Sequence, residues 1–232
     1  ITWSKVCSGG ISFRLLPDWA LFETGGPSIF PKNTEDTNFL LGILNSKPST
    51  DLLEILNPTL NFQSEDVKSL PIPPDTHQYR KQAETISKKC QHIAWKDWSC
   101  REISGDFAQH PLVQRKAASL KTAYDAWAEQ ATDDFFQLHA NEEELNELFI
   151  DLYGLEDELS PRVALDDITI LEDELDRGAL EELDDERDEL SEEELRDRLP
   201  FKIEVPIRQF LSYGVGVMLG RYQLGHDGLH IA

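Results

Sequence analysis

The first 30 residues combine short apolar and polar alternations with glycine-rich turns. Ile11 to Leu15 has the period of two that predicts a half-buried strand, and the turn before it is Ser8-Gly9-Gly10. Residues 19–22 and 28–30 have the composition of two further short strands. This part of the chain is therefore predicted to be a small strand-containing unit.

From residue 37 the spacing of apolar residues changes to that of a helix face. Phe39 to Leu44 fits one helix. A second apolar stretch ends at Asn57-Pro58, because the residue before a proline is disfavoured in helical geometry. A proline cluster between Leu70 and Pro74 is the clearest boundary in the sequence, so we place the end of the first segment at residue 76.

Two heptad-spaced stripes predict a pair of helices within residues 77–132. The first stripe steps by 4, 3, 4, 3 and 4 residues through Tyr79, Ala83, Ile86, Cys90, Ile93 and Asp97. The second follows Pro111, a favourable first-turn residue, and repeats these steps through Val113, Ala117, Leu120, Tyr124, Trp127 and Ala131. Two such helices on either side of a connection containing Gly105 are predicted to form an antiparallel pair.

Basic side chains lie off the first of these stripes. They are Arg80, Lys81, Lys88, Lys89 and Lys96. One interpretation is an ordinary solvated helix face; the other is a face that follows a phosphate backbone. The pattern is compatible with both.

Acidic residues dominate the segment 133–198. Glu142 to Tyr153 has a helical apolar face, whereas from Leu155 onward leucines recur irregularly among Asp and Glu, which predicts solvated helices. Residues 199–232 are apolar again and are predicted to contain a buried helix, with Ile207, Phe210, Leu211, Val215, Met218 and Leu219 inward. The predicted fold class is α+β and mostly helical: a small strand-containing domain (1–76), an antiparallel helix pair (77–132), an acidic helical segment (133–198) and an apolar helical segment (199–232).

The net charge of −22 comes from one of these segments. Residues 1–132 contain 15 acidic and 14 basic residues, residues 133–198 contain 27 and 5, and residues 199–232 contain 2 and 3. Because charges farther apart than a Debye length of ~8 Å are largely screened, the acidic segment does not exclude a nucleic-acid partner for the rest. The segment itself is interpreted as a solubilising face, as a mimic of DNA charge, or as a docking site for other subunits.

Several kinds of catalytic or binding site lack support in the sequence. Gly214-Val215-Gly216 with Gly220 differs from a dinucleotide fingerprint in its last interval, and close helix packing explains these glycines better. Cys90, His92 and Cys100 lack the spacing of a zinc site. No Gly-x-Ser-x-Gly motif is present either.

The stretch Asn57-Pro58-Thr59-Leu60 is compared with the Asn-Pro-Pro-aromatic turn of enzymes that methylate adenine. In that turn the polar groups accept from the target amino group and the aromatic ring stacks on the flipped base. Thr59 and Leu60 supply neither the second proline nor the ring. We therefore predict no catalytic residue, no metal and no cofactor site in this chain.

Cysteine usage and hydropathy predict the compartment. Cys7, Cys90 and Cys100 are irregularly spaced and indicate no disulfide framework, which favours a reducing environment. No signal-peptide pattern opens the chain, and the uncharged stretch 209–220 is shorter than the ~20 apolar residues that span a bilayer. We expect a soluble, cytoplasmic protein, and because the chain begins at Ile1 rather than Met we expect a piece of a longer one.

Several stretches together resemble one family. They are residues 1–9 (ITWSKVCSG), 39–46 (FLLGILNS), 56–63 (LNPTLNFQ), 146–155 (NELFIDLYGL) and 212–222 (SYGVGVMLGRY). They are similar to the middle region of the PglX family, the adenine-specific DNA methyltransferases of BREX phage-exclusion systems. The stretches at 1–9, 39–46 and 56–63 also resemble, more loosely, target-recognition regions of fused restriction–modification enzymes. The acidic segment has no counterpart that we can match.

The resemblance implies a role in phage defence. The parent enzyme would use S-adenosylmethionine, bound before Ile1, to methylate adenine N6 within a short DNA site. Residues 1–76 would then be part of a target-recognition domain and the helices after Tyr79 a spacer.

Recognition of double-stranded DNA requires donors and acceptors at base edges and cations on phosphates. The candidates in residues 1–76 are Lys5, Ser8, Gly9, Arg14, Lys32, Asn61, Gln63 and Lys68. Each of them is also compatible with an ordinary surface position, and Asn61 and Gln63 with bracing the turn after Pro58. The alternative function is a protein-interaction scaffold in a defence complex, with the acidic segment and the helix pair binding other subunits.

Overall fold

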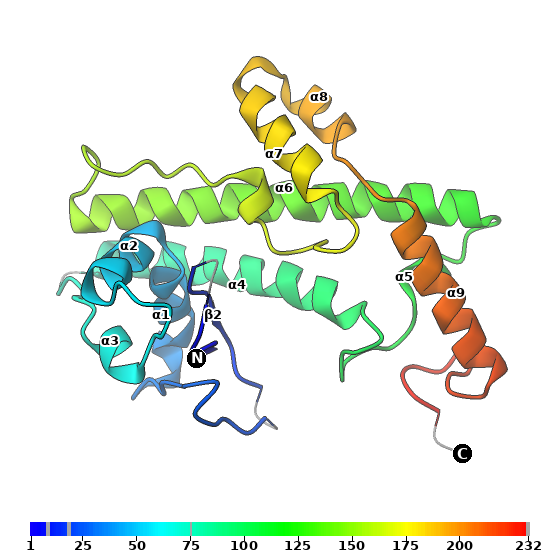
Figure 1. Cartoon of the computed structure of the whole chain (residues 1–232), viewed down its shortest axis with the longest axis horizontal. Helices are drawn as coiled ribbons and strands as arrows, with labels where there is room; N and C mark the ends of the chain where they lie inside the picture. Colours follow the sequence, from blue (N-terminus) through cyan, green and yellow to red (C-terminus); the bar gives the residue numbers. More distant parts are fainter. Residues whose placement is uncertain (8–9, 18–19, 75, 231–232) are drawn as a thin grey trace. The chain divides into compact units, whose positions relative to one another are not determined.

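The computed structural model describes residues 1–7, 10–17, 20–74 and 76–230 (Figure 1). The helices are α1 (Thr37–Leu44), α2 (Lys47–Leu56), α3 (Ser64–Lys68), α4 (His77–Ser99), α5 (Pro111–Gln114), α6 (Leu120–Tyr153), α7 (Arg177–Glu186), α8 (Glu192–Asp197) and α9 (Glu204–Met218). Strands β1 (Thr2–Trp3) and β2 (Phe13–Arg14) form a two-stranded antiparallel sheet. The predicted α+β, mostly helical fold class is confirmed.

The chain forms two compact units. Unit 1 contains residues 1–90 and 140–162, and unit 2 contains residues 91–139 and 163–232. The division falls within α4 and α6, so it does not follow the four predicted segments. The roles assigned to those segments stay predictions.

The sheet of unit 1 is built around buried aromatic side chains. Trp3 lies opposite Phe13 in the β1–β2 register, and their ring centroids are 5.4 Å apart. The predicted strand 11–15 is confirmed over Phe13–Arg14, with Phe13 buried and Arg14 exposed. In the predicted strand 19–22, Trp19 lies outside the described residues. Leu21 and Phe22 are not in a strand and are exposed, because the chain leads here into a tight turn at residues 23–26.

Neutral amide side chains join the helices of unit 1 to its other parts. Asn45 follows α1; its Oδ1 accepts from the Phe13 amide at 2.8 Å and its Nδ2 donates to the Phe13 carbonyl at 3.0 Å. Phe39 of α1 packs edge-on against Phe149 of α6, at a centroid distance of 5.9 Å. Both rings are almost completely buried. The sheet, α1 and α6 thus share one apolar core.

In unit 1, α4 forms an antiparallel pair with the end of α6, which the sequence analysis had placed in the acidic segment and not in the predicted pair. In unit 1, Gln82 donates to Glu144 at 2.9 Å and Tyr79 donates to Asp151 at 2.8 Å. In unit 2, Lys96 donates to Asp134 at 2.5 Å. Partner positions fall along α6 as they rise along α4, which is antiparallel packing, and the stripe residues Ala83, Ile86 and Ile93 are buried as predicted.

The second helix of the pair begins later than predicted and extends farther. Pro111 begins only the short α5, and residues 115–119 are not helical, with Lys116 at a φ of 49°. Helix α6 begins at Leu120, where the Ser119 hydroxyl accepts from the Thr122 amide at 3.1 Å and so caps the first turn. It continues to Tyr153, beyond the predicted segment boundary at 132.

The acidic part of unit 2 is packed rather than solvated, which corrects the prediction from its irregular leucines. Leu165, Ile168, Leu175 and Leu180 are fully buried. Much of residues 155–176 is non-helical, so their apolar spacing follows no helical period. Arg177, the first residue of α7, donates to the Ile168 carbonyl at 2.8 Å and so joins this non-helical segment to the helix.

Helix α9 buries a different face from the one predicted. Val205, Tyr213 and Gly216 face inward, whereas Leu211, Val215, Met218 and Leu219 are exposed. The reason is an aromatic cluster in which Tyr213 and Tyr222 stack at 5.0 Å and Phe107 meets both rings edge-on. The inward face is set by where these rings lie, which the helical period does not specify.

Candidate functional site

The segment that follows β1 brings several predicted residues together in unit 1. The Lys5 amide donates to the Gly25 carbonyl at 3.1 Å, and the Lys5 carbonyl accepts from the Phe62 amide at 2.9 Å. Val6 is bridged to Asn61, and the Cys7 amide donates to the Leu60 carbonyl at 3.0 Å. Lys5 and Asn61, far apart in the sequence, therefore lie on paired stretches of extended chain.

Arg14 lies near this paired chain. It is exposed on β2 opposite Thr2. Burial raises the pKa of the Cys7 thiol, and the positive charge of Arg14 partly opposes that shift. Arg14, Lys5 and Asn61 thus lie on chain segments that adjoin one another around residues 5–7, and we call this set of residues the ribbon cluster.

The turn before Asn61 is held rigidly by the Asn57 side chain. Its Nδ2 donates to Asp66 and to the Asn61 carbonyl, both at 2.7 Å. Its Oδ1 accepts from the Thr59 hydroxyl at 2.6 Å. Both polar atoms of this amide are therefore engaged in holding the turn. The side chains of Asn57 and Asp66 brace this turn, and Gln63 caps the start of α3 in a capping box, in which its main-chain amide donates to Asp66 at 2.8 Å.

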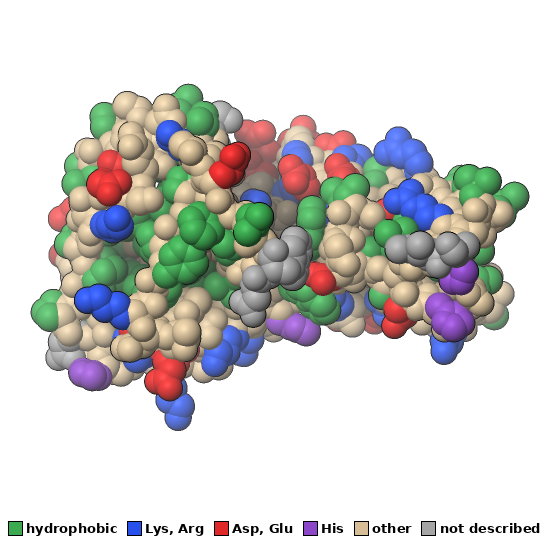
Figure 2. Space-filling model, turned by 90° about the horizontal axis from the view of Figure 1, so that it is seen from below, with side chains coloured by type: hydrophobic (Ala, Val, Ile, Leu, Met, Phe, Trp, Pro, Cys, Tyr) green, Lys and Arg blue, Asp and Glu red, His purple; other side chains and the backbone are tan. Residues whose placement is uncertain are grey.

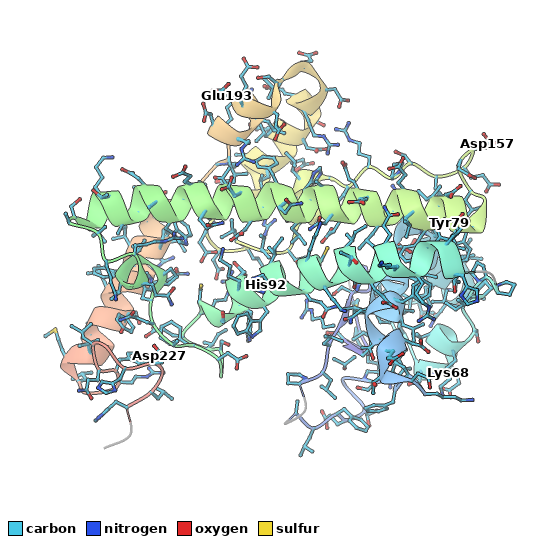
Figure 3. All side chains as sticks on the ribbon, turned by 180° about the vertical axis from the view of Figure 1, so that it is seen from behind. Lys68, Tyr79, His92, Asp157, Glu193 and Asp227 are labelled. Carbon is cyan, nitrogen blue, oxygen red and sulfur yellow. The ribbon has the colours of Figure 1, made fainter. Side chains whose placement is uncertain are left out.

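The other predicted site residues are not joined to the ribbon cluster by any described contact. Lys32 is exposed in the loop before α1. Lys68 is exposed on α3 and pairs with Glu65 at 3.4 Å (Figure 3). Ser8 and Gly9 lie outside the described residues. Gly10, which follows them, has a φ of 90°, a left-handed conformation that favours glycine at this turn.

The basic residues of α4 fall into two groups. Arg80 is held by Asp36 at 2.6 Å and lies over the Phe39 ring, and Lys96 is paired with Asp134. Lys81, Lys88 and Lys89 are exposed. The part of α4 in unit 1 therefore keeps three cations on its surface.

Burial disfavours the thiolate form, which is the form that binds metals, at Cys90 of α4 and at Cys100, which follows α4. Burial raises the pKa of Cys90 to about 12 and that of Cys100 to about 11, so both thiols stay protonated at neutral pH. Among the described residues, no group of three or more His, Cys, Asp or Glu side chains is placed to hold a metal ion.

One glycine of α9, Gly216, serves packing, whereas an added Cβ at Gly214 would meet nothing within 4 Å. The Tyr222 ring lies against Gly216, where an added Cβ would be only 2.6 Å from a ring carbon. A phosphate group has no room at that position.

Two surface features of unit 1 were missed from the sequence. One is an open acidic pocket between α4, α6 and residues 156–161, with Glu144, Glu147, Asp151 and Glu156 in its lining. The other is an exposed aromatic pair, Phe22 and Phe30, at a ring distance of 5.2 Å. Phe22 and Phe30 stood out in the sequence as apolar residues, but both were assigned to predicted strands.

In the part of the chain that the structure describes, no helix is long and apolar enough to cross a membrane.

Comparison with known proteins relates the whole chain to one kind of enzyme. No family model matches the sequence. The chain is 33% identical over 237 residues to "Adenine-specific methyltransferase PglX" of Lacticaseibacillus casei (strain Zhang), covering 100% of this chain and 17% of that protein. It is 26% identical over 230 residues to "Adenine-specific methyltransferase BrxX" of Escherichia coli O9:H4 (strain HS), covering 98% of this chain and 18% of that protein. The chain therefore spans less than a fifth of the length of these curated relatives, and the predicted resemblance is confirmed.

Proposed function

Because this chain corresponds over its whole length to one region of PglX-type adenine-specific methyltransferases, we propose that it supplies DNA target recognition to such an enzyme. In this proposal unit 1 contacts base edges and the exposed cations of α4 contact phosphates. The parent enzyme binds S-adenosylmethionine and transfers a methyl group to adenine N6 through parts outside this region. Its product marks cytoplasmic host DNA in phage defence.

The observation that carries the proposal is the ribbon cluster. The major groove admits a two-stranded β-ribbon, and bases are distinguished there by paired donors and acceptors. The β1–β2 sheet of unit 1 is a short two-stranded ribbon with two residues in each strand, in which Trp3 and Phe13 are buried and Arg14 is exposed. Arg14 can donate two hydrogen bonds to a guanine, and the exposed amide of Asn61 can pair with an adenine edge. The half-buried Lys5 adds a cation for the adjoining phosphates.

The turn at Asn57 is not suited to the methyl-transfer step. The Asn57 amide, which would have to accept from the target amino group, is bonded to Thr59, Asp66 and Asn61. We therefore assign this chain to recognition and derive no catalytic step from its residues.

A segment swap tests the proposal directly. Residues 1–76 of a PglX-type protein carrying this sequence are replaced by the matching segment of a relative with a different methylation site, and genomic N6-methyladenine is mapped by sequencing. We expect the methylated motif to change with the segment. An unchanged motif at an undiminished methylation level would move recognition elsewhere.

Single substitutions then separate base contacts from phosphate contacts. Arg14→Ala is expected to lose ~1–3 kcal/mol of discrimination at one position of the motif. Lys88→Ala is expected to weaken binding to all sequences alike and to lower the salt dependence by about one charge. Lys121→Ala is the matched control, because Lys121 is an exposed lysine of unit 2 and lies outside the proposed DNA surface. An Arg14→Ala effect equal at all sequences would assign Arg14 to phosphate.

A second candidate function concerns the acidic surface of unit 2. The leucines of α7 are packed while Glu181, Glu182, Glu192 and Glu193 on α7 and α8 are exposed. We propose that this surface binds basic surfaces of other defence-system subunits. Replacing these four residues with Gln tests it, and they suit the test better than Asp184, which accepts from the Leu165 amide. Loss of subunit binding in a purified system supports docking, whereas tighter DNA binding would support charge mimicry.

A further inference from the structure

Three large apolar side chains project from one corner of unit 1. Leu21 is 96% exposed, Phe22 56% and Phe30 65%. The two phenylalanine rings lie 5.2 Å apart at an interplanar angle of 55°. We call these three residues the aromatic corner. Figure 2 shows hydrophobic side chains gathered on a face of the part of the molecule that forms unit 1.

The aromatic corner is held in place by hydrogen bonds to the ribbon. Between Phe22 and Phe30 the chain makes a turn in which the Gly26 amide donates to the Glu23 carbonyl at 3.1 Å. The returning chain pairs with residues 1–5: Pro27 accepts from the Trp3 amide at 3.3 Å, and the Ile29 amide donates to the Ile1 carbonyl at 2.9 Å. The corner is therefore a fixed feature that directly adjoins the ribbon cluster.

The scarcity of charged residues at the aromatic corner favours a protein partner over DNA. Residues 20–31 contain a single charged side chain, Glu23, whereas 28% of the whole chain is charged. A DNA-binding surface needs cations, and this stretch has none. The centres of protein interfaces, in contrast, are depleted of charge and enriched in aromatic residues.

We propose that the aromatic corner is the surface by which this region docks onto the methyltransferase portion of a PglX-type polypeptide, which would present a complementary apolar surface. The inference rests on the proposed function. More than four-fifths of each relative lies outside the region that this chain matches. A recognition unit can set which adenine is methylated only if its distance from the reacting base is fixed, and an apolar contact beside the ribbon cluster would fix it.

The test compares one double variant in two settings. Phe22→Ser combined with Phe30→Ser is made in the isolated chain and in a PglX-type protein carrying this sequence. Ile55→Ser is the matched control, because Ile55 is a 77% exposed apolar residue elsewhere in unit 1. The isolated chain is measured for thermal stability and for affinity to a duplex containing the mapped motif. The longer protein is measured for N6-methyladenine in that motif.

We expect the double variant to leave the stability and DNA affinity of the isolated chain unchanged and to reduce methylation by the longer protein roughly tenfold or more. Ile55→Ser should change neither. Undiminished methylation would overturn the docking inference, as would lower DNA affinity of the isolated variant, which would assign the corner to DNA. A lower melting temperature of the isolated variant would overturn it too, because the corner would then belong to the core of unit 1.

The proposed function is tested by a separate experiment, so its failure can be distinguished from failure of the docking inference. A segment swap that leaves the motif unchanged would reject recognition by residues 1–76. A loss of methylation in the double variant would still indicate docking in that case.

Discussion

Units 1 and 2 differ in how their polar groups hold the fold. In unit 1, neutral amides connect separate segments: Asn146 of α6 accepts from the Lys47 amide at 2.9 Å and donates to the Pro161 carbonyl at 3.1 Å. In unit 2, charged groups do this, and Arg101 contacts Asp173 at 2.9 Å and Glu174 at 3.3 Å. The Glu174 side chain is buried and also accepts from Gln209 of α9 at 2.7 Å. A few arginines thus allow an acid-rich chain to pack.

The two units also use their basic residues in different ways. Unit 1 keeps Arg14, Lys81 and Lys88 on its surface, where they can meet a polyanion. Unit 2 uses Arg101 and Arg177 to bind its own carboxylates and carbonyls, so its exposed acids dominate what a partner meets. The large negative net charge therefore describes unit 2 better than it describes the proposed DNA surface.

The largest expected effect tests the apolar core of unit 1. Phe149→Ala removes a fully buried ring that packs on Phe39, and we expect it to cost about 4 kcal/mol of stability. Ile55→Ala, at an exposed position, should cost less than ~0.5 kcal/mol. Chemical denaturation measures both free energies of unfolding, and hydrogen exchange locates the loss. Loss of protection confined to residues 163–232 would contradict the assignment of Phe149 to the unit 1 core.

The second largest loss of stability is expected from the ion pairs around Arg101 in unit 2. Arg101→Met leaves Asp97 and Glu174 without their buried cation, and we expect a loss of about 3 kcal/mol. Asp173→Asn is the control, because the Asp173 side chain is 67% exposed, and it should cost less than ~1 kcal/mol. Equal effects of the two substitutions in denaturation experiments would show that burial of the pair is unimportant.

The sequence predicted best those helices in which one face is apolar and the opposite face is charged. The stripe containing Ala83, Ile86 and Ile93 could be assigned because charged residues occupy the opposite side of α4. The break before α6 was missed because residues 115–119 do not interrupt the heptad spacing. A local signal existed in Ser119 and Thr122, whose hydrogen bond caps the helix.

The parts that could not be predicted depend on contacts between distant residues. Leu165 and Leu175 are buried although they lie in a largely irregular part of the chain, so their burial follows no helical or strand period. In the ribbon cluster, Lys5 and Asn61 meet because main-chain groups pair across more than 50 residues. Side-chain chemistry identified both residues as candidates, but which candidates lie together is decided by that pairing.

Acid sensitivity is expected to arise in unit 2 from His110. Burial lowers the pKa of His110 to about 4, with Glu102 partly opposing the shift, and its Nδ1 accepts from the Leu112 amide at 3.3 Å. An unfolded histidine titrates near 6.5, so the unfolded state binds more protons between these values and stability falls as pH falls. We expect a loss of roughly 2 kcal/mol between pH 8 and pH 5.

The histidine variants isolate this pH dependence. His110→Asn retains a capping side chain without a titrating ring, so its stability should lose that part of the slope. His92→Asn, at an exposed position, should keep the slope. Parallel slopes for wild type and His110→Asn in denaturation measured from pH 8 to pH 5 would remove His110 as the cause.

The smallest expected effects come from two helical glycines, one in each unit. At Gly42 of α1 an added Cβ would lie 3.5–3.6 Å from Ser87, Leu145 and Phe149, which is ordinary contact. At Gly216 of α9 it would lie 2.6 Å from the Tyr222 ring, which is held by stacking on Tyr213. We expect Gly216→Ala to cost about 1–2 kcal/mol through overpacking. Gly42→Ala is expected to stabilise by about 0.5–1 kcal/mol, since the unfolded chain loses freedom without a clash. Thermal and chemical denaturation of the two variants should therefore give opposite signs. Stabilisation by Gly216→Ala would mean that the Tyr222 ring moves aside freely, and that the aromatic cluster does not fix the inward face of α9.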